Sequence, residues 1–252
     1  MLRECDGLVL RETKYREKDR MLTILSRHEG KISAKAKGAR GGKSRQSAGT
    51  QHLAYSSFTL FENRSRTLVN EAEPIELFLG IREDIEKLAL ASYFCEVLEA
   101  VADSDTGESG VLQTALNSLY ALSELKKPNA LIKCAFEWRI LALSGYLPSL
   151  EPSCGKCGEN GLVFLSLSDG RMSCVSCAET GAALRMPLCG EALCALRHLL
   201  GCEPKKLLSF NIDAGALKML GDASEAYMHA QLERGFYTLD FYKGLVNDDG
   251  QG

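Results

Sequence analysis

The chain has 252 residues, of which 45% are hydrophobic and 25% are charged, a composition typical of globular proteins. No apolar run approaches the roughly 20 residues that span a membrane, and the N-terminus lacks the apolar core of a signal peptide. The composition therefore excludes an integral membrane protein and predicts a cytoplasmic protein of two domains. The ten cysteines are expected to be reduced, because small secreted domains rather than chains of this length depend on disulfides.

The first 75 residues have the pattern of a small β domain. Short runs rich in Val, Leu, Ile, Phe, Thr and Tyr lie at residues 2–11, 20–26, 31–37, 53–61 and 66–72, and polar or glycine-containing turns separate them. Five strands in this length predict an OB-fold barrel over residues 1–75, and an SH3-like barrel fits almost as well. The polar segment 38–50 is expected to be a loop between strands.

From residue 76 onward the hydrophobic residues recur at helical spacing. Helices are expected near residues 77–98, 111–125, 130–143, 191–200 and 224–239. The fold class is therefore α+β, with a helical domain over residues 76–252. Residues 148–182 interrupt the helical pattern and are expected to form an insertion that carries two Cys-x-x-Cys pairs.

These two pairs predict a structural zinc site. Cys154 and Cys157 are separated from Cys174 and Cys177 by 16 residues, a spacing typical of four-cysteine zinc sites. Four thiolates complete a tetrahedral Zn²⁺ and leave no open position for water, so the metal would stabilise rather than catalyse. Two disulfides, or scattered free cysteines, are the alternative. A thioredoxin-like redox motif is disfavoured because the βαβ pattern around it is missing. The six remaining cysteines are expected to be inert core residues.

The charge of the chain is strongly asymmetric. The first fifty residues hold 13 Lys and Arg against 6 Asp and Glu, a net charge of +7, whereas the rest carries −10. Residues 30–61 contain no acidic residue. Strand alternation would place Lys31, Lys35 and Lys37 on one face, so the candidate DNA-binding residues are Lys31, Lys35, Lys37, Arg40, Lys43 and Arg45, with Arg11 and Lys14 at lower weight. The alternative is a basic loop that is merely solvated.

Several sequence stretches resemble the bacterial recombination mediator family RecO. They are YREKDR at residues 15–20, HEGK at 28–31, AKGAR at 36–40, KSR at 43–45, EAE at 71–73 and GYLPSL at 145–150. The resemblance covers nearly the whole chain. The chain departs from many relatives at Gly41 and Gly42, where further basic residues are common, which implies a loop of lower charge.

The resemblance implies an N-terminal OB-fold, a helical C-terminal domain and, in some members, the four-cysteine zinc site. It also implies binding of single- and double-stranded DNA, annealing of complementary strands, contact with single-stranded DNA-binding protein (SSB), and action with RecR to load RecA. A member of this family would be a cytoplasmic bacterial protein associated with the nucleoid when on DNA.

Two other functions are open from the sequence. A zinc hydrolase or deaminase would need an open metal position and a nearby acid/base, for which Glu159 is the one candidate. The sequence has no phosphate-binding loop of the Walker type, no nucleophile elbow and no His-Glu-x-x-His helix, so we expect no enzyme activity. A zinc-stabilised protein-interaction scaffold without DNA binding is the other alternative.

Overall fold

The structure is a computed structural model that describes residues 1–41, 46–63, 66–102, 109–151, 153–161, 163–179 and 184–249. Contacts group the chain into two compact units, which are residues 1–125 with 236–252 and residues 126–235. The chain leaves the first unit after Leu125 and returns to it at Phe236. A domain division at residue 75 separates strands from helices and remains a proposal, since several helices share a compact unit with the strands.

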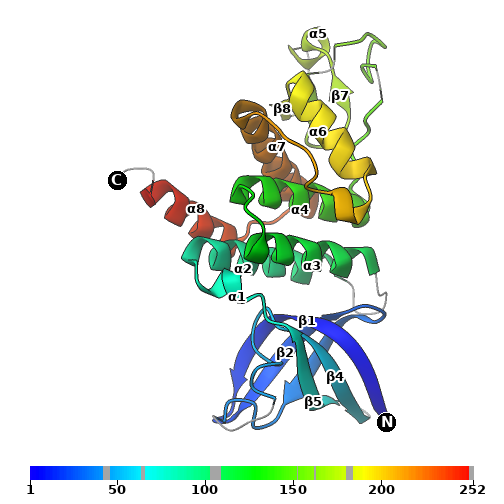
Figure 1. Cartoon of the computed structure of the whole chain (residues 1–252). Coiled ribbons are helices and arrows are strands. Elements are labelled where there is room, and N and C mark those ends of the chain that lie inside the picture. The colour runs from blue at the N-terminus through cyan, green and yellow to red at the C-terminus, as the bar shows by residue number, and fades with distance from the viewer. Residues whose placement is uncertain are drawn as a thin grey trace. The chain divides into compact units, whose positions relative to one another are not determined.

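A closed barrel of five strands forms the N-terminal part of the first unit (Figure 1). Its strands are β1 (Leu2–Tyr15), β2 (Asp19–Ser26), β3 (Gly30–Ala36), β4 (Tyr55–Asn63) and β5 (Arg66–Glu76). Their order around the barrel is β1-β2-β3-β5-β4, and β3 pairs with β5 in parallel while the other pairs are antiparallel. The predicted OB-type barrel is confirmed, and closure removes every strand edge.

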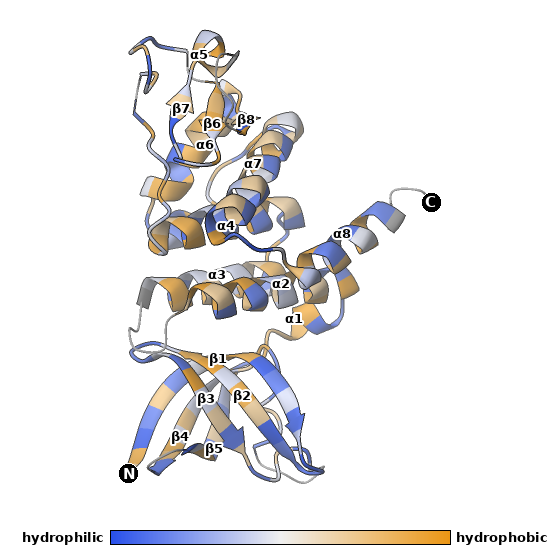
Figure 2. Ribbon diagram, turned by 180° about the vertical axis from the view of Figure 1, so that it is seen from behind, coloured by the Kyte–Doolittle hydropathy of each residue, from blue (hydrophilic) through white to orange (hydrophobic). Residues whose placement is uncertain are grey.

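Side-chain alternation along the strands builds the barrel core. On β3, Ile32, Ala34 and Ala36 are buried, whereas Ser33 and Lys35 lie on the outer face. Figure 2 shows hydrophilic and hydrophobic residues interspersed along the barrel strands. The predicted tight turn before β3 also forms: Gly30 has a φ of 64°, a conformation that glycine adopts without steric cost.

The helices of the first unit pack around α2 (Ile85–Val101), with α1 (Leu79–Arg82), α3 (Ser109–Glu124) and α8 (Tyr237–Asp249). Asp84 caps α2 by accepting hydrogen bonds from two backbone N–H groups of its first turn. The helix α8 joins from the far end of the chain: the Phe236 ring meets the edge of Tyr93 at a centroid distance of 5.5 Å, and the Thr238 N–H donates to Glu96 at 3.1 Å. The core of this unit therefore depends on residues more than 130 positions apart.

The second unit combines helices with a small sheet. Its elements are α4 (Asn129–Leu143), β6 (Phe164–Ser166), β7 (Met172–Ser173), α5 (Val175–Glu179), β8 (Arg185–Pro187), α6 (Gly190–Gly201), the 3-10 helix η1 (Pro204–Lys206) and α7 (Ala214–Leu232). The strands form an antiparallel sheet in the order β7-β6-β8. Trp138 of α4 stacks on Tyr227 of α7 at 5.6 Å, and its indole N–H donates to the Leu220 carbonyl.

A buried ion pair also joins the two long helices of this unit. Lys133 Nζ lies 2.8 Å from Glu137, which is fully buried, and 3.1 Å from Glu225 on α7. The Ser224 hydroxyl donates to the second oxygen of Glu137. The carboxylate is thus satisfied on both oxygens, as burial of a charge requires. No helix in the described part of the chain is long and apolar enough to cross a membrane.

Candidate metal centre and nucleic-acid interface

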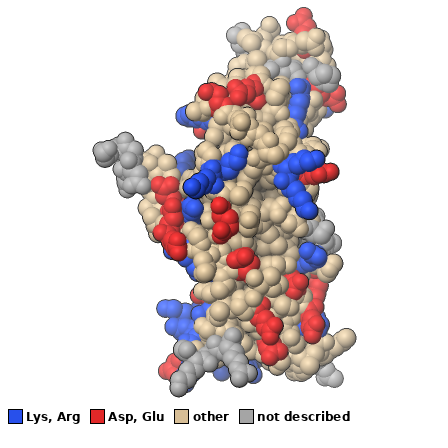
Figure 3. Space-filling model, viewed as in Figure 1, with Lys and Arg blue, Asp and Glu red and all other residues tan. Residues whose placement is uncertain are grey.

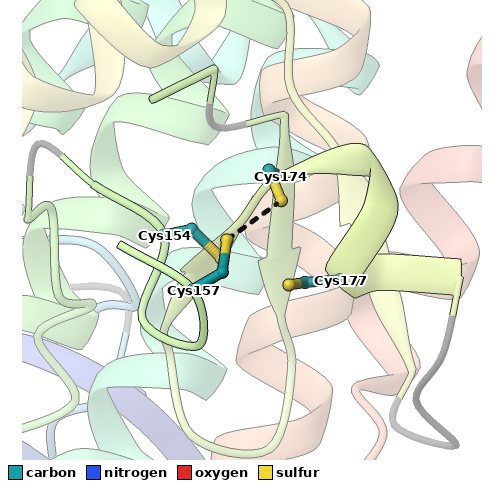
Figure 4. A group of neighbouring side chains, drawn as sticks. All are labelled: Cys154, Cys157, Cys174 and Cys177. Atoms are coloured by element: carbon teal, nitrogen blue, oxygen red, sulfur yellow. Dashed lines mark hydrogen bonds between the residues drawn. The ribbon is translucent and has the colours of Figure 1, made fainter. Parts of the chain in front are cut away.

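The four cysteines of the paired motifs converge from two short segments. Cys154 and Cys157 lie on a loop that the Cys154 N–H closes by donating to the Glu159 carbonyl at 2.8 Å. Gly158 follows with a φ of 75°, so the knuckle needs glycine at that position. Cys174 comes directly after β7, and Cys177 lies one turn later on α5. Figure 4 shows the four side chains pointing toward one another.

The sulfur positions fit a single metal ion. All four Sγ atoms lie within 4.8 Å of one another, and Cys157 Sγ is 3.7 Å from Cys174 Sγ. A tetrahedral zinc with Zn–S bonds of about 2.3 Å separates its sulfurs by about 3.8 Å. No disulfide joins these four cysteines in the structure, and their convergence agrees with the predicted metal site rather than with scattered thiols. The group could hold a metal ion in a shell made of sulfur alone.

Backbone N–H groups favour the thiolate form of one ligand. Hydrogen bonds from Cys157, Cys174 and Lys156 lower the pKa of the Cys154 thiol to about 6. The Cys177 pKa rises to about 12, chiefly because its thiol shares a hydrogen bond with Cys157. One negative charge is therefore already favoured in the cluster, and a cation would supply the charge that lets the other thiols ionise.

The other six cysteines fall into three groups, because Cys95 and Cys134 are buried, Cys194 is exposed, and the partly exposed ones are Cys5, Cys189 and Cys202. Cys95 and Cys134 are buried, and burial raises the pKa of Cys134 to about 12, so the prediction of inert core thiols is confirmed for this pair. It is wrong for Cys194, which is exposed. On α6 the buried residues are Ala192, Leu193, Ala195, Leu196 and Leu199, and position 194 faces away from them.

The Lys35 side chain is central to the outer face of the barrel. Its Nζ lies 2.8 Å from the Asp19 carboxylate and 4.6 Å from the centre of the Tyr15 ring. The ion pair with Lys35, and then the Gly38 N–H that donates to Asp19, lower the pKa of that carboxyl. Between this carboxylate and the Tyr15 ring the Lys35 side chain is largely covered, and 16% of it is exposed.

Two of the predicted DNA-binding residues instead bind α2. Lys31 Nζ donates to the Glu99 carbonyl at 2.8 Å, and Arg11 lies 2.6 Å from the Glu99 carboxylate. Both side chains thus hold the C-terminal part of α2 against the barrel. No sequence signal pointed to this pairing, because Glu99 is 68 residues beyond Lys31. DNA contact by either residue remains a proposal, and it would compete with these bonds.

The remaining basic residues lie on different faces. Lys37 is exposed just beyond β3, and Arg40 is exposed while its guanidinium donates to the Glu17 carbonyl. Lys14 pairs with Arg20, which in turn pairs with the buried Ala36, whereas Lys35 pairs with Met21. Neighbouring strand residues face opposite ways, so Lys14 lies on the other face from Lys35. Lys43 and Arg45 lie outside the described residues.

The visible charges on the barrel are segregated. In the view of Figure 3, Lys and Arg side chains gather at one lower corner of the barrel, and separate groups of Asp and Glu lie elsewhere on that face among uncharged residues. Lys35 lies near the end of β3, and Lys37 and Arg40 lie in the segment that follows it, so these candidates are close in sequence.

Comparison with known proteins decides the family. The model described as "Recombination protein O N terminal" matches residues 1–78, and "Recombination protein O C terminal" matches residues 82–240. The chain belongs to the RecO family. The resemblance drawn from the sequence is confirmed, and membership of RecO supports a role in DNA repair and recombination.

Curated RecO relatives match along most of the chain. The DNA repair protein RecO of Acetivibrio thermocellus is 38% identical over 242 residues, which cover 95% of both chains. The protein of the same name from Symbiobacterium thermophilum is 30% identical over 95% of this chain and 96% of its own. That of Alkaliphilus metalliredigens is 37% identical over 70% of this chain and 72% of its own. RecO similarity thus includes both the barrel and the cysteine-bearing unit.

Proposed function

We propose that this chain is a non-catalytic recombination mediator that binds single- and double-stranded DNA and anneals complementary strands. With RecR it would help to load RecA onto single-stranded DNA coated with SSB. The observation that carries the proposal is the basic outer surface of an OB-type barrel, at Lys35, Lys37 and Arg40, in a chain of the RecO family. Such a surface suits contacts to a phosphate backbone, which do not depend on base sequence.

The proposed phosphate contacts differ in their availability. Lys37 is exposed, and Lys35 and Arg40 each have hydrogen-bond donors left beyond the partners described above. Lys31 and Arg11 would first have to release Glu99, so we assign them at most a minor part. The proposal for Lys43 and Arg45 rests on their charge and position in the sequence, and that for Lys14 on charge alone.

For the metal centre we propose one structural Zn²⁺ per chain, bound by Cys154, Cys157, Cys174 and Cys177. The sulfur-only donor set favours zinc over calcium or magnesium, which prefer oxygen ligands. Four thiolates would fill its coordination shell, and in the described residues the ligand group contains no His, Asp or Glu. Zinc would therefore fold the insertion rather than activate water, which argues against the hydrolase and deaminase alternatives.

The decisive experiment is annealing of complementary strands precoated with SSB, across a salt series. The variant K35E/K37E/R40E would be compared with K126E/R197E/K218E, which makes the same charge change at exposed residues of the second unit. We expect the barrel variant to lose annealing and the control to keep it. In a plot of log affinity against log salt concentration, the slope should be less steep by about 3 in the barrel variant, because each lost phosphate contact reduces the slope by about 1.

The result also separates this proposal from the scaffold alternative. If the folded wild-type chain binds no DNA at low salt, the interaction scaffold is the better description. If both variants anneal equally well, the DNA-binding surface lies elsewhere on the chain. Circular dichroism and thermal melting of each variant would establish that a loss of binding does not follow from unfolding.

A further inference from the structure

A hollow of about 620 Å³ lies on the outer face of the barrel. It is lined by Tyr15, Met21, Ser33, Lys35, Glu62, Asn63, Arg66 and Thr67. The pairing register explains its position: Met21 is directly opposite Lys35 on the outer face of β2 and β3, and the β4–β5 hairpin supplies the far wall where Asn63 pairs with Arg66. Its volume is within the range of small-ligand sites.

Tyr15 gives this hollow an aromatic surface. It ends β1, its side chain is 40% exposed, and the next residue, Arg16, has a φ of 57° that turns the chain sharply toward β2. Lys35 lies over the ring at 4.6 Å, and the Arg16 guanidinium lies 5.7 Å from its centre. An exposed aromatic ring flanked by two cations is suited to a ligand that has both a flat π-system and a negative charge.

The rest of the lining fits the same kind of ligand. Met21 adds a polarisable apolar surface, while Ser33, Asn63 and Thr67 offer donors and acceptors. Arg66 adds a positive charge to that of Lys35, which is shared with Asp19. The one acidic residue of the lining, Glu62, lies 3.8 Å from Arg3, which also pairs with Glu29. A single nucleotide combines a flat base, polar edges and a phosphate, and so matches each of these features.

We propose that this hollow is a nucleobase subsite for single-stranded DNA, in which one unstacked base stacks on Tyr15 while Lys35 and Arg66 bind the adjacent phosphates. The inference rests on the proposed DNA-binding function and goes further, because a base-stacking site distinguishes single strands from duplexes. In a duplex the bases are stacked within the helix, so none of them can stack on Tyr15, and the phosphates remain the main contact for the basic surface. The hollow would thus favour the strands that annealing consumes over the duplex it produces.

The test measures affinities by fluorescence anisotropy for three probes of equal length: oligothymidylate, an abasic deoxyribose-phosphate strand and a duplex. Y15A and Y15F would be compared with wild type and with Y120A, which removes an exposed tyrosine of α3. We expect Y15A to bind oligothymidylate about 5- to 100-fold more weakly, the range that loss of one stacked base gives. Its affinity for the abasic strand and the duplex should stay within about twofold of wild type, and Y15F and Y120A should match wild type on all probes.

Other outcomes would contradict the base-stacking subsite, and each of them also shows whether the proposed DNA-binding function fails with it. If Y15A weakens all three probes equally, Tyr15 acts by positioning Lys35, and no base enters the hollow. If Y15A changes nothing while K35E/K37E/R40E loses binding, the barrel binds DNA through phosphates alone. If wild type binds none of the probes, the DNA-binding function itself fails. Circular dichroism of Y15A and retention of its duplex affinity would show that the barrel is folded.

Discussion

At the residue scale, His52 is a half-buried imidazole whose charged form is disfavoured in the folded protein. Burial, followed by the nearby Arg82 guanidinium, lowers the pKa of His52 from 6.5 to about 4. Its Nε2 lies 3.5 Å from the Ser92 hydroxyl on α2, and Arg82 donates to its backbone carbonyl. The folded state therefore holds the imidazole neutral at pH values where the unfolded chain protonates it.

We predict that the first unit loses stability as the pH falls from 6.5 toward 4. In that window the unfolded state binds more protons, so acid favours unfolding, and below pH 4 the effect is complete. Between pH 7.5 and 4.5 the free energy of unfolding should fall about 2–3 kcal/mol further in wild type than in H52Q. Urea titrations at both pH values measure this, and comparison with H52Q removes the contribution of Asp and Glu. Equal pH dependence in the two proteins would show that the folded state does not hold His52 neutral.

At the scale of elements, the sheet of the second unit is too small to be stable alone. Its strands β6, β7 and β8 have two or three residues each, whereas independent sheets need longer strands. The Leu167 carbonyl accepts a hydrogen bond from Gln231 of α7, and Tyr227 approaches Gly170 so closely that a Cβ there would lie 2.5 Å from its hydroxyl. The insertion therefore packs on α7, and its own strands contribute little.

We predict that removing the metal unfolds the insertion and weakens its packing on α7, because metal-binding energy is folding energy here. After chelation, or in C174S, limited proteolysis should cut between residues 150 and 180, while the barrel stays resistant. Mass spectrometry of the untreated protein should find one zinc per chain. C194S serves as the control, because that cysteine is exposed on α6 and outside the cluster. Proteolysis and melting that do not change on metal removal would contradict a structural role.

The sequence predicts well those features that depend on residues close together in the chain. The barrel followed from alternating strands and glycine turns, and the metal ligands from the spacing of two Cys-x-x-Cys pairs, since both patterns span few residues. Contacts between residues far apart in the sequence could not be predicted in this way. No pattern near Lys31 or Arg11 indicates that both bind Glu99. No pattern in residues 237–249 indicates which helix this segment packs against. Cys194 is exposed because it lies on the side of α6 away from the buried residues. Its apolar sequence neighbours therefore gave a wrong prediction of burial.

At the scale of the whole molecule, the first unit is built from two separate stretches of chain. Phe236, Leu239 and Tyr242 of the C-terminal stretch are all buried. Burying side chains of this size contributes about 1.5–3 kcal/mol each, so together they supply about 5–8 kcal/mol. That is a large share of the 5–15 kcal/mol that stabilises a typical domain. A barrel with α1, α2 and α3 alone would therefore lack much of its stabilising core.

We predict that a chain ending at Gly235 has a strongly destabilised first unit and an intact second unit. Trp138 is the single tryptophan and lies in the second unit, so its fluorescence follows that unit alone, whereas hydrogen exchange of the barrel strands follows the first. On truncation the barrel amides should exchange far faster while the fluorescence transition in urea stays at nearly the same midpoint. A chain ending at Asn247 keeps all three buried residues and should behave as wild type. Equal barrel protection in the two truncated chains would mean that α8 covers the first unit without stabilising it, and that residues 1–125 fold by themselves.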